Sequence, residues 1–268
     1  MKSNIIRWVA AAVLVMLAGV ACGEGELRGY ERSNGYVYVT LGEYMQSIDG
    51  GVPEEHNNTW TWSRNLIKDT TGMTFEKTPI LWRVLTVDDE KAYLASEYVL
   101  FASPTHNNVT EYKTIGKDFG NTELSVLLNS TFLNEAFTEE EQSMLLVNDT
   151  KGKVFLLTSA DVKNKEIGMG SGEGLKAWGT EYAIRVTGLF VYRTCNGSHS
   201  PYWVMDQSTT DKRHARCTKA DGSLGHIVAD RENEGARPAV YLDINSYTIT
   251  GGTGTKTDPY VLAPKAAN

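Results

Sequence analysis

The chain is poor in cysteine and in basic residues. Its three cysteines are too few for a disulfide scaffold, and no group of His and Cys residues has the spacing of a zinc site. Lys and Arg total 26 against 33 Asp and Glu, a net charge of −7, which argues against binding to the phosphate backbone of nucleic acid. Hydrophobic residues make up 41% and charged residues 22% of the 268 residues, so composition disfavours disorder, collagen and coiled coil.

The longest uncharged hydrophobic run, residues 8–20, stands near the start of the chain behind a short basic segment. This arrangement is typical of a signal peptide, and the run is too short to span a bilayer, which takes about 20 residues. Small residues and then Cys22 follow, a pattern that resembles a bacterial lipoprotein signal, although Gly19 stands where such signals usually have Leu. The resemblance implies a signal peptide at residues 1–21 and acylation of Cys22.

The expected cleavage removes Lys2 and Arg7, which takes the net charge from −7 to −9. Residues 22–35 are polar and glycine-rich and are interpreted as a flexible tether after the lipidated Cys22. Because two or more acyl chains give stable attachment, we expect an extracytoplasmic protein anchored to a membrane. Ordinary signal-peptidase cleavage, which would give a secreted protein, and a retained membrane anchor are the alternatives.

Runs rich in β-branched and aromatic residues predict an antiparallel β core. Residues 79–87 and 91–100 are separated by a short acidic turn, and neighbouring strands of this kind pair antiparallel. The turn at 220–223 is a second hairpin signal, whereas 50–77 is interpreted as an insertion or long loop. Further short strands are predicted at 36–41, 153–158, 202–205, 215–219, 225–228, 239–242 and 260–262.

Helical patterns occupy the middle of the chain. One helix is predicted to begin near Thr122, where leucines recur at positions i, i+3 and i+4. Another is predicted to begin at Thr138, which forms a capping box with Glu141, and to run to about Leu146. A third helix start is predicted at Ser159. The first two helices are expected to pack on the sheet.

Several motifs, taken in order along the chain, resemble a bacterial family known as domain of unknown function 6273. They are Leu41-Gly42-Glu43-Tyr44-Met45-Gln46, Pro79-Ile80-Leu81-Trp82-Arg83-Val84-Leu85, Ala95-Ser96-Glu97-Tyr98-Val99-Leu100, Leu127-Leu128-Asn129-Ser130-Thr131-Phe132-Leu133, Val154-Phe155-Leu156-Leu157-Thr158, Tyr202-Trp203, and Gly235-Ala236-Arg237-Pro238-Ala239. Each motif alone is weak, but their number and order make the match fairly specific.

This resemblance implies an α+β, C-type-lectin-like fold, similar to formylglycine-generating-enzyme-like domains, with an antiparallel β-sheet core, two or three helices and long loops. It implies a single lectin-like domain at residues 36–262, followed by a tail at 263–268. The family usually continues Tyr-Trp with Leu-Arg-Ser, whereas Val204, Met205 and Asp206 follow here. No role of that Arg is therefore carried over to this chain.

Cys195 and Cys217 lie in the segment that we expect to be exported. In an oxidising compartment they can form a disulfide, which would stabilise the fold by about 3 kcal/mol in loop-entropy terms. With Cys22 acylated, this pairing leaves no odd cysteine. Two separate buried thiols are the alternative.

The segment 192–216 is the predicted ligand surface, because it combines aromatic and charged side chains suited to sugar stacking or protein contacts. The candidate ligand-binding residues are Tyr202, Trp203, Asp206, Asp211 and Arg213. Trp203 also lies on a predicted strand, so a core position is its alternative interpretation.

No residue is assigned a catalytic or metal-binding role. His199, His214 and His226 fall in the C-terminal third, but without the spacing of a known metal motif, and we interpret them as solvated loop residues. A Gly-x-Ser-x-Gly sequence is also lacking.

We therefore expect a non-enzymatic, lipid-anchored surface protein that binds a glycan or protein ligand. Its expected partners are the membrane, through Cys22, and that ligand, with no nucleic acid and no cofactor. The alternatives are an enzyme of the formylglycine-generating superfamily with an unrecognised site and a structural component of the cell envelope.

Overall fold

Two β-sheets form the framework of the protein. The computed structural model describes Leu27 and residues 35–48, 70, 72–148, 150–170, 174–190 and 199–266. In spatial order, the larger sheet consists of β11 (Tyr247–Gly251), β12 (Tyr260–Pro264), β1 (Tyr38–Ile48), β2 (Phe75–Val87), β3 (Lys91–Ser96), β10 (Pro238–Asp243) and β5 (Val154–Leu156). The smaller sheet consists of β4 (Phe101–Ala102), β9 (Gly235–Ala236), β6 (Tyr202–Gln207), β7 (His214–Thr218) and β8 (Leu224–Val228).

Most neighbouring strands pair antiparallel, as predicted; β1 with β12 and β6 with β9 are the parallel exceptions. Short helices connect the strands: α1 (Val109–Ile115), α2 (Glu123–Leu127), α3 (Leu133–Ala136), α4 (Glu139–Ser143) and α5 (Glu181–Arg185). A π-helical turn, η3 (Leu128–Phe132), joins α2 to α3, and η2 (Phe119–Asn121) and η4 (Asp161–Lys163) are 3-10 turns. The protein is a mixed α+β fold in which sheets predominate.

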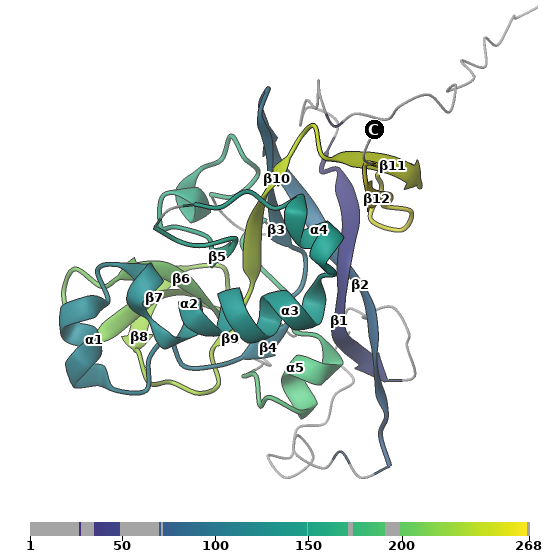
Figure 1. The fold of residues 1–268 in the computed structure, drawn as a ribbon. Coiled ribbons are helices and arrows are strands. Elements are labelled where there is room, and N and C mark those ends of the chain that lie inside the picture. The colour runs from purple at the N-terminus through teal and green to yellow at the C-terminus, as the bar shows by residue number, and fades with distance from the viewer. Residues whose placement is uncertain are drawn as a thin grey trace, which may run out of the picture.

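The helices lie against the sheets as Figure 1 shows. The continuous segment of α2, η3 and α3 runs in front of the sheets, and the side chain of Gln207 at the end of β6 donates to carbonyls of α1. Contacts join α3 and α5 to β1, α5 also to β4, and η3 to β5. The predicted packing of the first helical segment on the sheet is thus confirmed.

Local signals in the sequence set the starts of these helices. The hydroxyl of Thr122 accepts a hydrogen bond from the amide of Ser125 and caps α2. Thr138 and Glu141 form the predicted capping box at the start of α4. Both helix starts are therefore confirmed.

Helix ends are set by contacts that the sequence pattern does not contain. The helix that begins at Thr138 ends at Ser143 and not near Leu146, because the Leu146 amide donates to the carbonyl of Tyr241 in β10. The helix predicted at Ser159 is a single 3-10 turn, η4. There the Asp161 carboxylate accepts from the amide and hydroxyl of Thr158, a local pairing that competes with longer helix.

Both predicted hairpins are confirmed. In the β2–β3 turn, Asp88 accepts from the amides of Glu90 and Lys91. In the β7–β8 turn, the Lys219 amide donates to Ser223 at 2.8 Å, and Gly222 supplies a φ of +82° that few other residues adopt. The strands β4, β9 and β11 were not predicted, and the first two are only two residues long.

A single hydrophobic core cluster draws side chains from both sheets. Its largest fully buried members include Trp82 of β2, Phe155 of β5, Phe132 of η3 and Trp203 of β6. The indole of Trp82 donates to the carbonyl of Leu41 at 2.8 Å, so its polar atom is satisfied inside the core. The two sheets are therefore packed against one shared interior.

A buried ion pair joins β2 to the end of β3. The guanidinium of Arg83 donates to Glu97 from Nε at 2.8 Å and from a terminal nitrogen at 2.6 Å, and another nitrogen donates to the carbonyl of Gly174. Lys256 contacts the other carboxylate oxygen at 3.1 Å. Burial alone would raise the pKa of Glu97, but the charges of Arg83, Arg237 and Lys256 together lower it.

Arg237 ties the two sheets together. It stands between β9 of the smaller sheet and β10 of the larger one and is fully buried. Its Nε donates to the carbonyl of Ser96, the last residue of β3, at 2.8 Å, and a terminal nitrogen donates to the hydroxyl of Tyr202, the first residue of β6, at 3.2 Å. One side chain thus bonds to a strand end in each sheet.

Replacing Glu97 by Gln should lower the free energy of unfolding by about 3 kcal/mol at neutral pH, because it leaves the buried Arg83 without its counter-charge. The folded-state pKa of Glu97 is lowered, so its contribution is present above the unfolded carboxyl pKa and is lost as the pH falls through the folded value. Urea unfolding should therefore give a higher free energy of unfolding for the parent protein than for Glu97→Gln, and this difference should become smaller in acid.

The exposed Glu232→Gln is the matched control, because it removes the same charge from the surface and should leave stability nearly unchanged. Equal unfolding free energies for the parent protein and Glu97→Gln at neutral pH would show that the buried pair does not stabilise the fold.

Candidate functional site

Tyr202 and Trp203 lie in the core. Their side chains are 1% and 0% exposed. The hydroxyl of Tyr202 donates to the carbonyl of Leu175 at 2.8 Å, and the indole of Trp203 donates to the carbonyl of Ser103 at 2.7 Å. The core interpretation of Trp203 is thus confirmed, and neither ring presents a face on which a sugar can stack.

Asp211 and Arg213 are bonded to each other in the exposed turn between β6 and β7. The guanidinium donates to the two oxygens of Asp211 at 3.1 and 2.7 Å. Hydrogen bonds from Arg213 hold the pKa of Asp211 well below its usual range. Asp206, another of the predicted ligand-binding residues, lines a cleft with groups from other parts of the chain.

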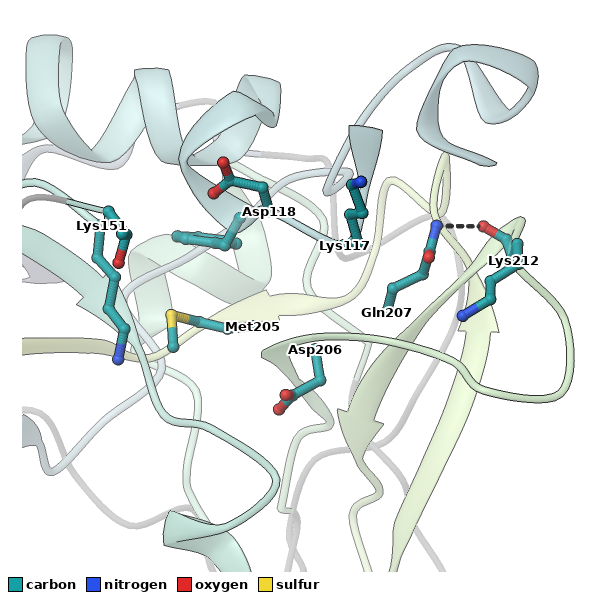
Figure 2. Close-up of a pocket in the computed structure, with 9 residues that line it drawn as sticks. Lys117, Asp118, Lys151, Met205, Asp206, Gln207 and Lys212 are labelled. Atoms are coloured by element: carbon teal, nitrogen blue, oxygen red, sulfur yellow. Dashed lines mark hydrogen bonds between the residues drawn. The ribbon is translucent and has the colours of Figure 1, made fainter. Parts of the chain in front are cut away.

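This cleft has a volume of about 500 Å³ and lies where β6 ends (Figure 2). Met205, Asp206 and Gln207 of β6 contribute to its lining. The remaining lining residues are Lys117, Asp118 and Phe119 from the α1–η2 connection, Thr150 and Lys151 from the turn before β5, and Lys212 from the β6–β7 turn. Four separate segments therefore meet at one site.

Asn129 holds the wall formed by the turn before β5. Its Oδ1 accepts from the amides of Lys153 and Val154, and its Nδ2 donates to the carbonyls of Ser125, Lys151 and Val154. Gly152 has a φ of +79°, and a Cβ there would meet the Asn129 side chain at 2.3 Å. The π-helical turn η3, which carries Asn129, thus fixes the backbone of Lys151.

Gln207 holds the opposite part of the cleft. Its amide nitrogen donates to the carbonyls of Tyr112 and Lys113 in α1, at 2.9 and 3.3 Å. It also donates to the carbonyl of Lys212 at 2.8 Å, the bond drawn in Figure 2. The end of α1, the end of β6 and the β6–β7 turn are therefore joined through one side chain.

The two aspartates of the cleft are held by donors of the protein itself. Asp118 caps η2 by accepting from the amide of Gly120 and also accepts from the side chain of Asn121. Asp206 accepts from the amide of Ser159. These bonds fix both carboxylates at the cleft before any ligand is present.

Unlike the aspartates, the three lysines of the cleft are not held by charged partners among the described residues. Lys117, Lys151 and Lys212 form no ion pair with any of the described residues. The ammonium group of Lys151 lies 5.2 Å from the ring centre of Phe155, a weak cation–π contact. With two carboxylates against three ammonium groups, the cleft carries local positive charge in a chain of net charge −7.

The phenol of Tyr112 lies near this site. Its hydroxyl is buried and has no hydrogen-bond partner among the described residues. Burial, with a smaller effect of the charge on Asp206, raises the pKa of Tyr112, so the phenol stays protonated at neutral pH. A neutral hydroxyl of this kind can donate a hydrogen bond but cannot act as a base.

The cleft offers mainly charged and polar groups to a ligand. Its side chains are ammonium, carboxylate, carboxamide and hydroxyl groups, with apolar surface from Phe119 and Met205. Within the described ranges, no group of three or more His, Cys, Asp or Glu side chains is placed to hold a metal ion. The arrangement suits polar, anionic ligands, which ammonium groups recognise by charge.

Lys212 and Gln207 lie in the predicted ligand segment 192–216 but were not among its candidate residues, and sequence reasoning missed Lys117 and Lys151. They lie far apart in the sequence, and the residue types alone gave no signal that they meet. Asn129 did stand in one of the motifs quoted for the family resemblance, but without an assigned role.

Comparisons of the chain with models of known protein families, with curated proteins and with solved structures found no match. The family resemblance and the lectin-like fold therefore stay predictions. In the described part of the chain, no helix is both long and apolar enough to cross a membrane. Cys22 and Cys195 lie outside the described residues.

Cys217, on β7, is a free and buried thiol in the structure. Burial, and then the charge of Glu234, raises its pKa to about 12, so the reactive thiolate is scarce at neutral pH. Burial also raises the pKa of Glu234 to about 7. A disulfide at Cys217 would therefore form more readily before β7 packs than afterwards.

The predicted partner of Cys217, Cys195, lies outside the described residues, so the disulfide stays a prediction.

Mass spectrometry of the exported protein, digested without reductant, should find a peptide that links Cys195 to Cys217. Free thiols must be alkylated in denaturant, because the buried Cys217 would escape reagent in the folded protein. Two alkylated cysteines under these conditions would refute the disulfide and support the alternative of separate thiols.

Proposed function

We propose that this chain is a lipid-anchored, extracytoplasmic binding protein whose lectin-like domain holds an acidic glycan in the cleft at the end of β6. The observation that carries this proposal is the set of three lysines without ion-pair partners among the described residues, lining one cleft of about 500 Å³. A volume of this size lies within the range of small-molecule and saccharide sites.

The walls of the cleft support a binding role because they are already fixed. Asn129 holds the backbone of Lys151, and Gln207 holds that of Lys212, so little ordering is required when a ligand binds. Carboxylate or phosphate groups on a sugar would pair with the lysines, and sugar hydroxyls would bond to Gln207 and Thr150. Phe119 and Met205 also line the cleft, but both are buried, so the polar groups would make most of the contacts with a sugar.

The signal sequence and the tether support an extracytoplasmic location at a membrane. A lipid at Cys22, followed by the polar residues 23–35, would place the domain a short distance from the membrane. A glycan of the cell envelope or of the surroundings is then the ligand within reach. The negative charge of the mature chain would repel acidic glycans elsewhere on its surface, so the cleft would also direct where they bind.

Replacing Lys117, Lys151 and Lys212 together by Gln should weaken binding of oligogalacturonate, an acidic probe, by about tenfold. Each exposed ion pair contributes a few tenths to about 1 kcal/mol, so three of them reach this range. Isothermal titration calorimetry would measure the change, and added salt should weaken the binding of the parent protein because it screens these pairs.

The matched control replaces the exposed Lys163, Lys219 and Lys265 by Gln, which changes net charge equally but leaves the cleft intact. A neutral maltooligosaccharide should bind far more weakly than the acidic probe. An equal loss of affinity in both triple variants would show that overall charge, and not the cleft, causes the effect. The absence of saturable binding to any glycan would favour a structural envelope component.

Replacing Cys22 by Ser should release the protein from the membrane fraction, because the acceptor of the lipid is lost. Ultracentrifugation of cells that express each form, followed by immunoblotting, measures the distribution. Serine at a neighbouring position, Gly23→Ser, is the control and should leave the protein in the membrane fraction. Unchanged membrane attachment of Cys22→Ser would contradict lipidation.

A further inference from the structure

Two histidines that are separated in sequence face each other across the β7–β8 hairpin. In the strand register, His214 pairs with Val228 and Arg216 pairs with His226, so the two histidines are diagonal neighbours. Their Nδ1 atoms lie 3.1 Å apart, and their ring centres are 5.1 Å apart. The side chain of His214 is 27% exposed and His226 is exposed, so a solute can reach both rings.

The separation of these two nitrogens matches that of two ligands on one metal ion. Imidazole nitrogens bind Zn²⁺ at about 2.0–2.1 Å, which places two of them about 3.3 Å apart in a tetrahedral site. Without a metal, the same approach requires one ring to donate a proton that the other accepts. The distance between the two nitrogens therefore suits a chelated ion, and a turn of the rings would direct both lone pairs at it.

We propose that His214 and His226 form a surface site for a divalent transition-metal ion, with water completing the coordination. The two donors are imidazoles, which suit Cu²⁺, Ni²⁺ and Zn²⁺, and the general order of affinities puts Cu²⁺ first. Hard ions such as Mg²⁺ prefer oxygen ligands and should not bind here.

The charged groups around His214 and His226 determine whether the ion has a third ligand from the protein. Asp211 Oδ2 lies 3.8 Å from His214 Nδ1, but Arg213 holds the same oxygen at 2.7 Å. Arg216 is the direct strand neighbour of His226 and adds positive charge nearby. The site is thus a two-histidine site, in agreement with the absence of any three-residue metal group from the described part of the chain.

The backbone around His214 keeps the site in place. The Ser208 amide donates to the carbonyl of His214 at 2.8 Å, and the amide of His214 donates to the carbonyl of Asp211 at 3.0 Å. His226 is fixed by the antiparallel ladder of β8 with β7. Because both backbones are held, ion binding requires only small movements of the rings, which favours affinity.

The test is a Cu²⁺ titration of the purified full chain, prepared without a histidine tag and stripped of metal. Calorimetry should show one site, and electron paramagnetic resonance should show nitrogen coupled to the copper. His214→Ala and His226→Ala should each weaken binding by at least about tenfold, since even outer partners of metal ligands contribute at this scale. The double variant should bind more weakly than either single variant, because it has lost both imidazole ligands.

Asp211→Asn is the matched control, and it should retain affinity within about threefold if the carboxylate is not a ligand. Circular dichroism of the metal-free variants verifies that each still folds.

Copper binding that survives in both histidine variants, or no binding by the parent protein, would overturn the proposal. Loss of binding in Asp211→Asn equal to that in the histidine variants would overturn the two-histidine assignment. Displacement of Cu²⁺ by Mg²⁺ would also contradict it, because an imidazole site discriminates against hard ions.

Discussion

The buried guanidinium of Arg237 is the contact on which the arrangement of the two sheets depends. It occupies the point at which the chain passes from β9 to β10 and bonds to Ser96 in one sheet and to Tyr202 in the other. Ser96 is followed by Glu97, which pairs with Arg83, so the two arginines act on adjacent residues. Burying a charge is costly, and these bonds offset part of that cost in one relative placement of the sheets, although the other terminal nitrogen of Arg237 has no hydrogen-bond partner among the described residues.

That placement also positions the cleft. Strand β6 begins in the core, where Tyr202 bonds to Arg237 and Trp203 is fully enclosed, and ends at Gln207 among the cleft residues. The aromatic residues that looked like a ligand surface instead anchor the strand that delivers Asp206 and Gln207. Their role at the cleft is indirect, because a strand fixed at one end presents its other end in a defined position.

The β6–β7 turn lies between the two sites proposed for this protein. Lys212 belongs to the cleft, and His214, two residues later, belongs to the histidine pair. Gln207 fixes the carbonyl of Lys212, while Arg213 and Asp211 bond to each other on the outside of the turn. Three residues of this short segment thus have different contacts. Lys212 lines the cleft, Asp211 pairs with Arg213, and His214 lies against His226.

The sequence by itself determined the features that depend on neighbours along the chain. The capping residues Thr122 and Thr138, the hairpin turns at 88–90 and 220–223, and most strands followed from local propensity and spacing. The sequence predicted burial only in part, since Trp203 was compatible with both a core and a surface position. Tertiary structure alone decided the helix end at Ser143, the meeting of the cleft lysines and the approach of His214 to His226, because these result from contacts between distant segments. Periodicity describes which face of an element is apolar, but it carries no information on which elements meet.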